Sequence, residues 1–290
     1  MGCSEIQGAI VIYEVAIRLG FFFGVFAMVG LWELILPRRP LTTSKAVRWF
    51  SNLAITVLNP AVVYLLFPIV PVGAALLAQK SGWGVLNNVD LPYWFAVAVG
   101  VMVLDLAIYL QHVMFHTLPV FWRLHMMHHT DLDFDITTGL RFHPIEMILS
   151  MGIKLSVVVL IGAPPLAVLL FEVLLNATSM FNHGNIRLPL RIDRKLRLLV
   201  VTPDMHRVHH SVTIRETNSN FGFNLPWWDR LLGTYRDQPA AGHDGMVIGH
   251  AQFRDARRLT LPWLLALPFI GKPGEYAINR RGREPVDRKR

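Results

Sequence analysis

Residues 92–130 have the sequence PYWFAVAVGVMVLDLAIYLQHVMFHTLPVFWRLHMMHHT, which begins as an apolar run and ends among five histidines. The run from about Pro92 to Phe115 is long enough for a helix that crosses a hydrocarbon core about 30 Å thick, which takes about 20 residues. This stretch predicts a membrane-spanning helix that carries histidines to one end of a helical bundle.

The composition of the whole chain agrees with a membrane protein. Of its 290 residues, 53% are hydrophobic and 17% are charged, whereas soluble domains carry about 25% charged residues. The single cysteine, Cys3, excludes a disulfide framework and a cysteine-based zinc finger. Most of the lysines and arginines behind the net charge of +8 lie from Arg187 onward, which favours a membrane surface over nucleic acid. The start is acidic and the first apolar run is long, so no cleaved signal peptide is expected.

The apolar runs predict an all-α fold, an integral-membrane helical bundle of about four to five spans. Glu14 and Arg18 lie four residues apart in the first span and can pair. The second span contains three prolines and is expected to be kinked or broken. A short run, Leu261 to Ile270, is expected to lie at the membrane interface. The spans are expected at about 9–36, 53–78, 92–115, 144–162 and 164–182, the last two forming a hairpin.

Loop charges predict the orientation of this bundle. The loop between the first two spans carries four basic residues, whereas the next loop carries only Lys80, against Asp90. Basic loops stay in the cytoplasm, which places the N-terminus outside. The third span then ends in the cytoplasm near His116, and the hairpin returns the chain there near His183. All histidine-rich segments, and the C-terminus, are therefore expected on the cytoplasmic side.

Eight of the twelve histidines fall into three tight groups. Side chains three or four residues apart lie on one face of a helix, with Cβ atoms about 5–6 Å apart, so that two imidazoles can reach one metal ion. Burying so many imidazoles without partners would cost several kcal/mol, which metal ligation removes. The groups are His112 and His116; His125, His128 and His129; and His206, His209 and His210.

Two stripes of polar residues lead up to these groups. Both stripes begin deep in an apolar span and end at a histidine, so the two helices are expected to face each other and to bring His183 into the cluster. Asp105 and Glu172 lie too deep for ligation and are expected to line a cavity or to orient ligands. Interhelical hydrogen bonding without function is the alternative. The stripes are Asp105, Tyr109, His112 and His116 in the third span, and Glu172, Asn176, Ser179 and His183 in the fifth.

The residue types also restrict the metal. No thiolate and few carboxylates accompany the histidines, and imidazole suits zinc, copper, iron and nickel. Nine grouped histidines exceed the three or four that one tetrahedral zinc needs, so two ions are expected. Zinc is expected to replace other metals readily in a recombinant sample.

The histidine groups resemble those of the sterol desaturase / fatty acid hydroxylase superfamily, whose members are integral-membrane di-iron enzymes. The resemblance extends over roughly 95–235. Further similar motifs are RFHPIE (141–146), FNHGN (181–185), TP (202–203), NSNFG (218–222) and WDRLLGT (228–234).

This resemblance implies a membrane bundle capped by a cytosolic di-iron centre. It implies O2-dependent hydroxylation or desaturation of a lipid, an oxidoreductase of the monooxygenase type, with electrons from a separate reductase or donor protein. Some relatives supply a tenth histidine shortly after the position of His183, where this chain has Asn185 and Arg187, so water or another residue is expected there. The ligands carried over are His112, His116, His125, His128, His129, His183, His206, His209 and His210.

Other polar residues near the motifs are candidates for supporting roles. His143 is expected to begin a helix or to bond a carboxylate such as Glu146, rather than to ligate a metal. Asn218 and Asn220 either cap a helix or bond a ligand histidine. The full set of candidates for cavity lining or ligand orientation is Asp105, Tyr109, His143, Glu172, Asn176, Asn185 and Asn218.

Further acidic residues and histidines lie after the second histidine group and in the C-terminal part of the chain. Asp131, Asp133 and Asp135 follow the second histidine group and either orient imidazoles or form a solvated turn. His243 and His250 lie in a polar stretch and are expected to be ordinary surface residues.

The function expected from these features is oxidation of a membrane lipid, approached by its tail through a cavity between the third and fifth spans. A histidine-rich metal transporter is the main alternative, although its ligands should lie near the midplane at broken helices. A haem or metal scaffold is another, but haem needs only one or two histidines. The spacing leaves hydroxylation or desaturation open, and the lipid as sterol, fatty acyl chain, alkylglycerol ether or carotenoid-like chain.

The expected organisation has three parts. Residues 1–92 form N-terminal membrane segments, 93–240 form the catalytic domain, and 241–290 form an interfacial segment with a basic tail from Arg280, expected to be solvated. No part resembles a fused electron carrier.

Overall fold

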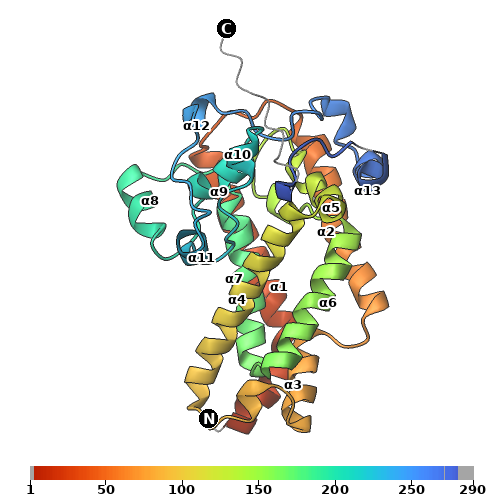
Figure 1. The fold of residues 1–290 in the computed structure, drawn as a ribbon, viewed down its shortest axis with the longest axis vertical. Coiled ribbons are helices and arrows are strands. Elements are labelled where there is room, and N and C mark those ends of the chain that lie inside the picture. The colour runs from red at the N-terminus through yellow and green to blue at the C-terminus, as the bar shows by residue number, and fades with distance from the viewer. Residues whose placement is uncertain (1–2, 271, 280–290) are drawn as a thin grey trace.

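A computed structural model describes residues 3–270 and 272–279, and these form a helical bundle topped by a helical cap (Figure 1). Among the described residues the only β-type pairings are two isolated bridges, Pro37 with Ile186 and Ser211 with Ile248. The all-α prediction is therefore confirmed. The basic tail from Arg280 lies outside the described residues.

In the part of the chain that the structure describes, five segments are long and apolar enough to cross a membrane. Large apolar side chains on their outer faces, such as Leu65 and Val57, are exposed and would contact hydrocarbon chains. The chain is thus a multi-pass membrane protein by the length and composition of its helices. The spans are α1 (Cys3–Ile35), α2 with α3 (Lys45–Leu66 and Pro71–Ser81), α4 (Tyr93–Thr117), α6 (Pro144–Ile161) and α7 (Pro165–Asn182).

The second span is broken, as its prolines predicted. Helix α2 ends at Leu66, Phe67 has extended backbone angles, and α3 begins at Pro71. Pro68 lies in the break, and proline tends to hold the preceding residue out of the helical conformation. The hairpin between α6 and α7 turns at Gly162, whose φ of 67° suits a residue without Cβ.

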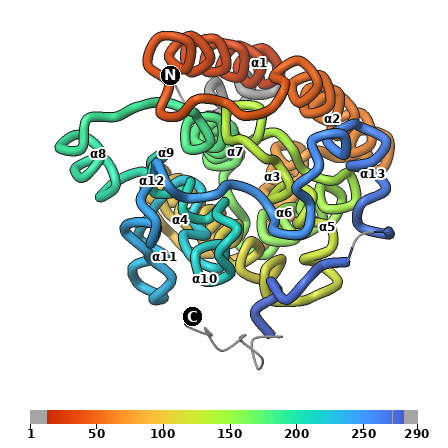
Figure 2. The backbone as a smooth tube through the Cα atoms, turned by 90° about the horizontal axis from the view of Figure 1, so that it is seen from above, coloured from red at the N-terminus to blue at the C-terminus, as the bar shows by residue number. Residues whose placement is uncertain are grey.

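Helix α7 lies between α1 and α4 when the bundle is seen from above (Figure 2). A core cluster joins Leu104 and Ile108 of α4 to Val168 and Phe171 of α7. The two helices therefore face each other, as expected. A Cβ on Gly100 would lie 2.9 Å from the Cβ of Ala167, so α4 and α7 approach closely at that level. This contact leaves no room there for the lipid cavity that we expected between the two spans.

The cap lies at the end of the bundle away from the N-terminus (Figure 1). Its short helices are joined by loops that run across the ends of α2, α4 and α7. Helix α13 packs against α5 and α2. The remaining elements are η1 (Val85–Asn87), α5 (Pro119–His129), η2 (Thr138–Leu140), α8 (Leu190–Leu196), α9 (Pro203–His209), α10 (Ile214–Thr217), α11 (Trp227–Leu231), α12 (Gly242–Gly245), η3 (Ala256–Arg258) and α13 (Leu261–Ile270).

Candidate metal centre

Nine buried histidines form two adjoining groups where the bundle meets the cap. Within each group, one ring nitrogen from every residue lies within 4.8 Å of the others. The residues come from the ends of α4, α5, α7 and α9. The five-histidine group consists of His112, His116, His125, His129 and His209, and the four-histidine group of His128, His183, His206 and His210.

These spatial groups divide the histidine motifs of the sequence. His128 and His129 are neighbours in the chain, but their rings are nearly perpendicular, at 89°, and they enter different groups. His209 and His210 divide in the same way, with rings at 78°. Successive residues on a helix point about 100° apart, so each histidine doublet can serve two sites.

The four-histidine group is built around His183. The Nδ1 of His183 lies 2.8 Å from the carbonyl oxygen of Ser179, and the Nδ1 of His128 lies 3.3 Å from that of Arg141. A carbonyl only accepts, so both Nδ1 atoms carry the proton and each Nε2 keeps its lone pair. The Nε2 of His183 is nevertheless 3.2 Å from the Nε2 atoms of His128, His206 and His210.

The five-histidine group shows the same arrangement. The Nε2 atoms of His112 and His125 lie 3.1 Å apart, and those of His116, His129 and His209 have no partner among the described residues. In four of the five imidazoles, Nδ1 lies within hydrogen-bond distance of an oxygen. The Nδ1 atoms of His112 and His209 lie 2.7 Å from the carbonyl oxygens of Phe221 and Ser219. The Nδ1 of His116 lies 3.1 Å from Asn218 Oδ1, and the Nδ1 of His125 lies 2.7 Å from Glu146 Oε1.

Lone pairs that face each other at this distance repel unless a cation lies between them. With a metal–nitrogen bond of about 2.1 Å, two ligand nitrogens lie about 3.0 Å apart at a right angle and about 3.4 Å apart at a tetrahedral angle. The measured separations of 3.1 and 3.2 Å fall in this range. The residues present therefore fit a metal ion in each group, and the all-imidazole donor set suits iron or zinc.

Burial keeps these imidazoles neutral. Loss of water lowers the pKa of His183 to about 3, and it lowers the pKa values of His128, His129, His206, His209 and His210 well below their ordinary range. Neighbouring imidazoles lower most of them further, because protonation would bring like charges together. The neutral ring is the form that ligates a metal, so the groups are ready to bind at neutral pH.

Phenylalanine rings enclose the histidines. Phe142 stacks on His128 with ring centroids 4.5 Å apart, and Phe134 stacks on His183 at 5.3 Å. Phe223 lies 5.0 Å from His112. This apolar shell keeps water away from the histidine groups.

The polar stripe of α4 binds the cap segment 218–234. Asp105 accepts a hydrogen bond from Trp228 Nε1 at 2.8 Å, and the hydroxyl groups of Tyr109 and Thr234 lie 2.8 Å apart. His112 and His116 bond the same segment through Phe221 and Asn218. Asp229 then holds this segment together, because it accepts from the backbone N–H groups of Phe221 and Gly222, both at 2.8 Å.

The polar stripe of α7 instead belongs to an ion network inside the bundle. Glu172 lies 2.8 Å from Lys154 and 3.1 Å from Arg18. Arg18 also pairs with Glu14 at 3.0 Å, which confirms that predicted pair. These groups compensate one another's charge within the membrane-spanning part. Of the other stripe residues, Asn176 donates to the carbonyl of Glu172 in its own helix, and Ser179 donates to the carbonyl of Gly139 in η2.

The acidic residues after the second histidine motif follow neither expected alternative. They are buried, and they bind the N-terminal part of the chain instead of imidazoles or water. Arg48 at the start of α2 donates to Asp131 at 2.6 and 2.9 Å and to Asp135 at 2.7 Å. Asp133 accepts from the backbone and hydroxyl groups of Thr42 and Thr43.

His143 and Asn185 lie outside both groups. His143 caps α6, where its Nδ1 accepts from the N–H of Ile145 at 3.2 Å, so the helix-entry alternative is confirmed. Glu146 bonds His125 rather than His143, a role that the sequence did not reveal although the residue stands in a recognised motif. Asn185 holds the loop after α1, through two bonds to the backbone of Arg39.

The prediction that His243 and His250 lie on the surface is wrong. The loop after α12 folds back on the cap, where Gly249 N–H bonds the carbonyl of His210, and both side chains are buried. His250 lies 4.2 Å from the ring of Tyr276. Burial lowers the pKa of each of these two histidines to about 4.

Comparison with known proteins confirms the resemblance. Residues 97–234 match the family model described as fatty acid hydroxylase. The chain is 28% identical over 247 residues to an ornithine lipid hydroxylase of Rhizobium tropici, covering 82% of this chain and 73% of that protein.

Alkylglycerol monooxygenases are similar to a shorter part of the chain. The protein of Xenopus tropicalis is 28% identical over 163 residues, and that of Homo sapiens 27% over 152 residues. These alignments cover 53% and 50% of this chain but only 34% and 31% of those proteins. No solved structure matches. The relatives are oxidoreductases, as expected.

Proposed function

From the match of residues 97–234 to the fatty acid hydroxylase family, we propose that this membrane protein is a lipid hydroxylase whose nine histidines hold two iron ions. It uses O2, and a separate donor protein supplies the electrons. The names of the relatives favour hydroxylation over desaturation.

One observation carries the proposal. Imidazole lone pairs face one another at 3.1 and 3.2 Å in two adjoining groups, while carbonyl or carboxylate oxygens hold the opposite ring nitrogens. Such an arrangement suits two metal ions. A bound metal pair would activate O2, the oxidant of the C–H bond, which side chains alone cannot do.

The chain's own residues position the ligands and keep the site dry. The carboxylate of Glu146 accepts a hydrogen bond from the Nδ1–H of His125, which fixes the orientation of the ring and leaves Nε2 free to bind a metal. Phe134 and Phe142 cover the rings of His183 and His128. Exclusion of water in this way protects a reactive site from side reactions.

The alternative of a metal transporter is less well supported. Transporter sites lie near the midplane of the membrane, typically at broken helices. The histidines of this chain instead lie at the ends of α4 and α7 and in the cap, and the broken span, α2 with α3, contributes none. Metal uptake into vesicles that contain the protein would contradict the proposal.

The first test compares the protein with His128→Ala, and His143→Ala serves as a control histidine outside both groups. We expect about two irons per chain in the wild type and in the control, and a loss of iron in His128→Ala. In a host that supplies iron and a donor, only the wild type and the control should add oxygen to a lipid, as measured by mass spectrometry. An unchanged lipid profile in all three strains would refute the proposal.

The orientation is proposed from the basic loop between α1 and α2, which puts the histidine end in the cytoplasm. Reporter fusions at the C-terminus test this point. A fluorescent protein that folds only in the cytoplasm should be active there, and a periplasmic phosphatase should not.

A further inference from the structure

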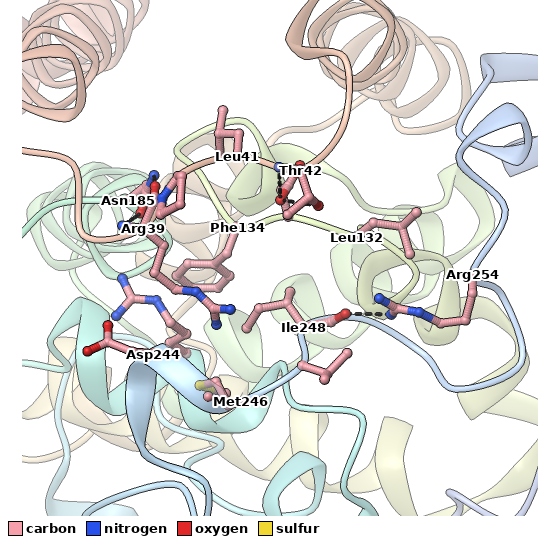
Figure 3. Close-up of a pocket in the computed structure, with 15 residues that line it drawn as sticks. Arg39, Leu41, Thr42, Leu132, Phe134, Asn185, Asp244, Met246, Ile248 and Arg254 are labelled. Carbon is pink, nitrogen blue, oxygen red and sulfur yellow. Dashed lines mark hydrogen bonds between the residues drawn. The ribbon is translucent and has the colours of Figure 1, made fainter.

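A pocket of about 260 Å³ opens in the cap beside the four-histidine group. Figure 3 shows Arg39 and Arg254 on opposite sides of this pocket, with Phe134, Met246 and Ile248 between them. Nothing in the site described above uses this space. We call it the arginine pocket.

Two arginines of the pocket carry N–H groups without acceptors. The Nη1 of Arg39 and the Nε of Arg207 are buried and have no partner among the described residues. Arg207 is fully buried and also pairs with Asp204. Arg254 makes one bond, to the carbonyl of Ile248. A ligand with anionic oxygens would satisfy these donors, as guanidinium groups bind carboxylate and phosphate.

The acidic residues of the pocket are already engaged. Asp133 is held by Thr42 and Thr43, and Asp244 pairs with Arg38 at 2.6 Å. Both carboxylates still attract the arginines through their charge, but the three arginines of the lining (Arg39, Arg207 and Arg254) outnumber the two aspartates, so the pocket keeps an excess of positive charge.

Apart from Thr42 and Asn185, the rest of the lining is apolar, and part of it leads toward the candidate metal centre. Phe134 lines the pocket, and its ring lies 5.2 Å from the guanidinium carbon of Arg207 and 5.3 Å from the ring of His183. One aromatic side chain therefore separates the pocket from the four-histidine group. Further apolar lining residues are Leu41, Leu132, Met246, Val247 and Ile248.

The pocket also lies where a bilayer would end. Arg39, on one wall of the pocket, comes four positions after Ile35, the last residue of α1. The side chains of Ile35 and Leu36 are both exposed. Backbone bonds from Arg38 to Asn185 and from Arg187 to Leu36 fix this loop against the end of α7. Lipid headgroups occupy this level of a membrane.

We propose that the arginine pocket binds the phosphate or carboxylate group of a membrane lipid, and that it thereby selects an anionic lipid as the substrate. The second half of this inference rests on the proposed function. The apolar lining and the nearby bilayer level favour a lipid over a free anion or an acidic protein, neither of which needs apolar walls.

Binding to the purified, metal-loaded protein in detergent tests the inference without turnover. The probes are dioctanoyl phosphatidic acid, dodecanoate, uncharged dioctanoylglycerol and inorganic phosphate. The variants are Arg39→Gln and Arg254→Gln, with Arg194→Gln, an exposed arginine of α8 outside the pocket, as the control. Thermal unfolding confirms that each variant is folded.

We expect at least one of the two anionic lipids to bind at least tenfold more tightly than dioctanoylglycerol and inorganic phosphate. Arg39→Gln should weaken this binding at least tenfold and Arg254→Gln by a smaller factor, whereas Arg194→Gln should change it less than twofold. Equal binding in Arg39→Gln and the wild type would overturn the inference, as would inorganic phosphate that binds as tightly as the lipids.

Two further outcomes separate this inference from the proposed function. If Arg39→Gln loses anionic-lipid binding and the wild type oxidises no lipid, the binding role of the pocket is supported and the proposed function is refuted. If Arg39→Gln keeps lipid binding but loses electron transfer from an acidic donor protein, the pocket belongs to the donor and the inference is overturned.

Discussion

Glu146 shows how far the candidate metal centre depends on residues that are not ligands. It is the first carboxylate of α6, and it accepts the Nδ1 proton of His125 at 2.7 Å. Such outer partners fix the ring and raise its basicity, and their loss typically costs 10- to 100-fold in metal affinity.

Glu146→Ala should therefore weaken metal binding in the five-histidine group by about 10- to 100-fold. Glu146→Gln keeps an oxygen acceptor and should recover part of this loss. Competition with a chelator measures the affinity. Equal affinities in Glu146→Ala and the wild type would show that His125 needs no partner.

Gly139 lies against the central histidine of the other group. A Cβ at this position would lie 2.6 Å from the carbonyl oxygen of Ser179 and 3.0 Å from Nδ1 of His183. Gly139→Ala should displace His183 and reduce the metal content by about one ion per chain. Gly152→Ala is the control, since its Cβ meets nothing within 4 Å. Full metal content in Gly139→Ala would contradict this prediction.

His250 should make stability depend on pH. Its pKa is about 4 in the folded protein, because burial disfavours the charged ring, against an ordinary value of 6.5. The unfolded chain therefore binds this proton more readily than the folded protein. The contribution of His250 to the free energy of unfolding is fully present above pH 6.5 and is lost as the pH falls toward 4. The loss amounts to roughly 1.4 kcal/mol per pH unit for one proton.

His250→Phe keeps an aromatic ring beside Tyr276 and removes the titrating group. Denaturant unfolding of both proteins between pH 4 and 6.5 should show a shallower pH dependence in the variant. Parallel curves would mean that His250 does not titrate in this range.

At the scale of elements, the segment 218–234 connects α4 to the five-histidine group. Asp105 and Tyr109 bond one part of it, and its other part bonds His112 and His116. The polar stripe of α4 therefore aligns a cap segment with the histidines of the same helix. The structure favours this packing role over the lining of a cavity.

Asp229→Ala should release this segment. The carboxylate accepts from two backbone N–H groups and from the hydroxyl of Thr234, and each buried donor left without an acceptor costs about 1–3 kcal/mol. We expect about 3 kcal/mol or more of destabilisation and loss of metal from the five-histidine group before the other group. Asp255→Ala, at an exposed turn, is the control. Unchanged thermal unfolding of Asp229→Ala would refute this prediction.

At the scale of the whole molecule, the N-terminal spans and the histidine cap form a single structure. Helix α1 packs along α7, and Glu33 of α1 accepts backbone hydrogen bonds from Ile136 and Asn185, both at 2.7 Å. Arg48 binds Asp131 and Asp135 in the cap. These contacts join the described part of the N-terminal segments to the part of the chain that we expected to be the catalytic domain.

Arg48→Met should therefore destabilise the whole protein. Removal of one partner from a buried ion pair costs about 3–5 kcal/mol, because it leaves the other charges unpaired. Arg191→Met, in the exposed part of α8, is the control. Thermal unfolding in detergent should show one lowered transition for Arg48→Met, whereas two transitions would indicate that the cap unfolds separately.

The sequence alone determined the spans and the eight histidines of the three short motifs. Both depend on local properties, namely the length of an apolar run and the repeat of a helix, and neighbouring residues settle these whatever the rest of the chain does. The break at Pro68 and the pairing of Glu14 with Arg18 were predictable for the same reason.

Only the tertiary structure decided which histidines meet and what holds them. His128 shares a group with His183, whereas its neighbour His129 shares a group with His209. Arg48 binds Asp131 across the bundle, and the loop that carries His250 folds back and buries it. These contacts join residues far apart in the chain, and nothing in the local spacing of residues specifies them. They arise when the apolar helix faces pack and the buried polar groups must find partners.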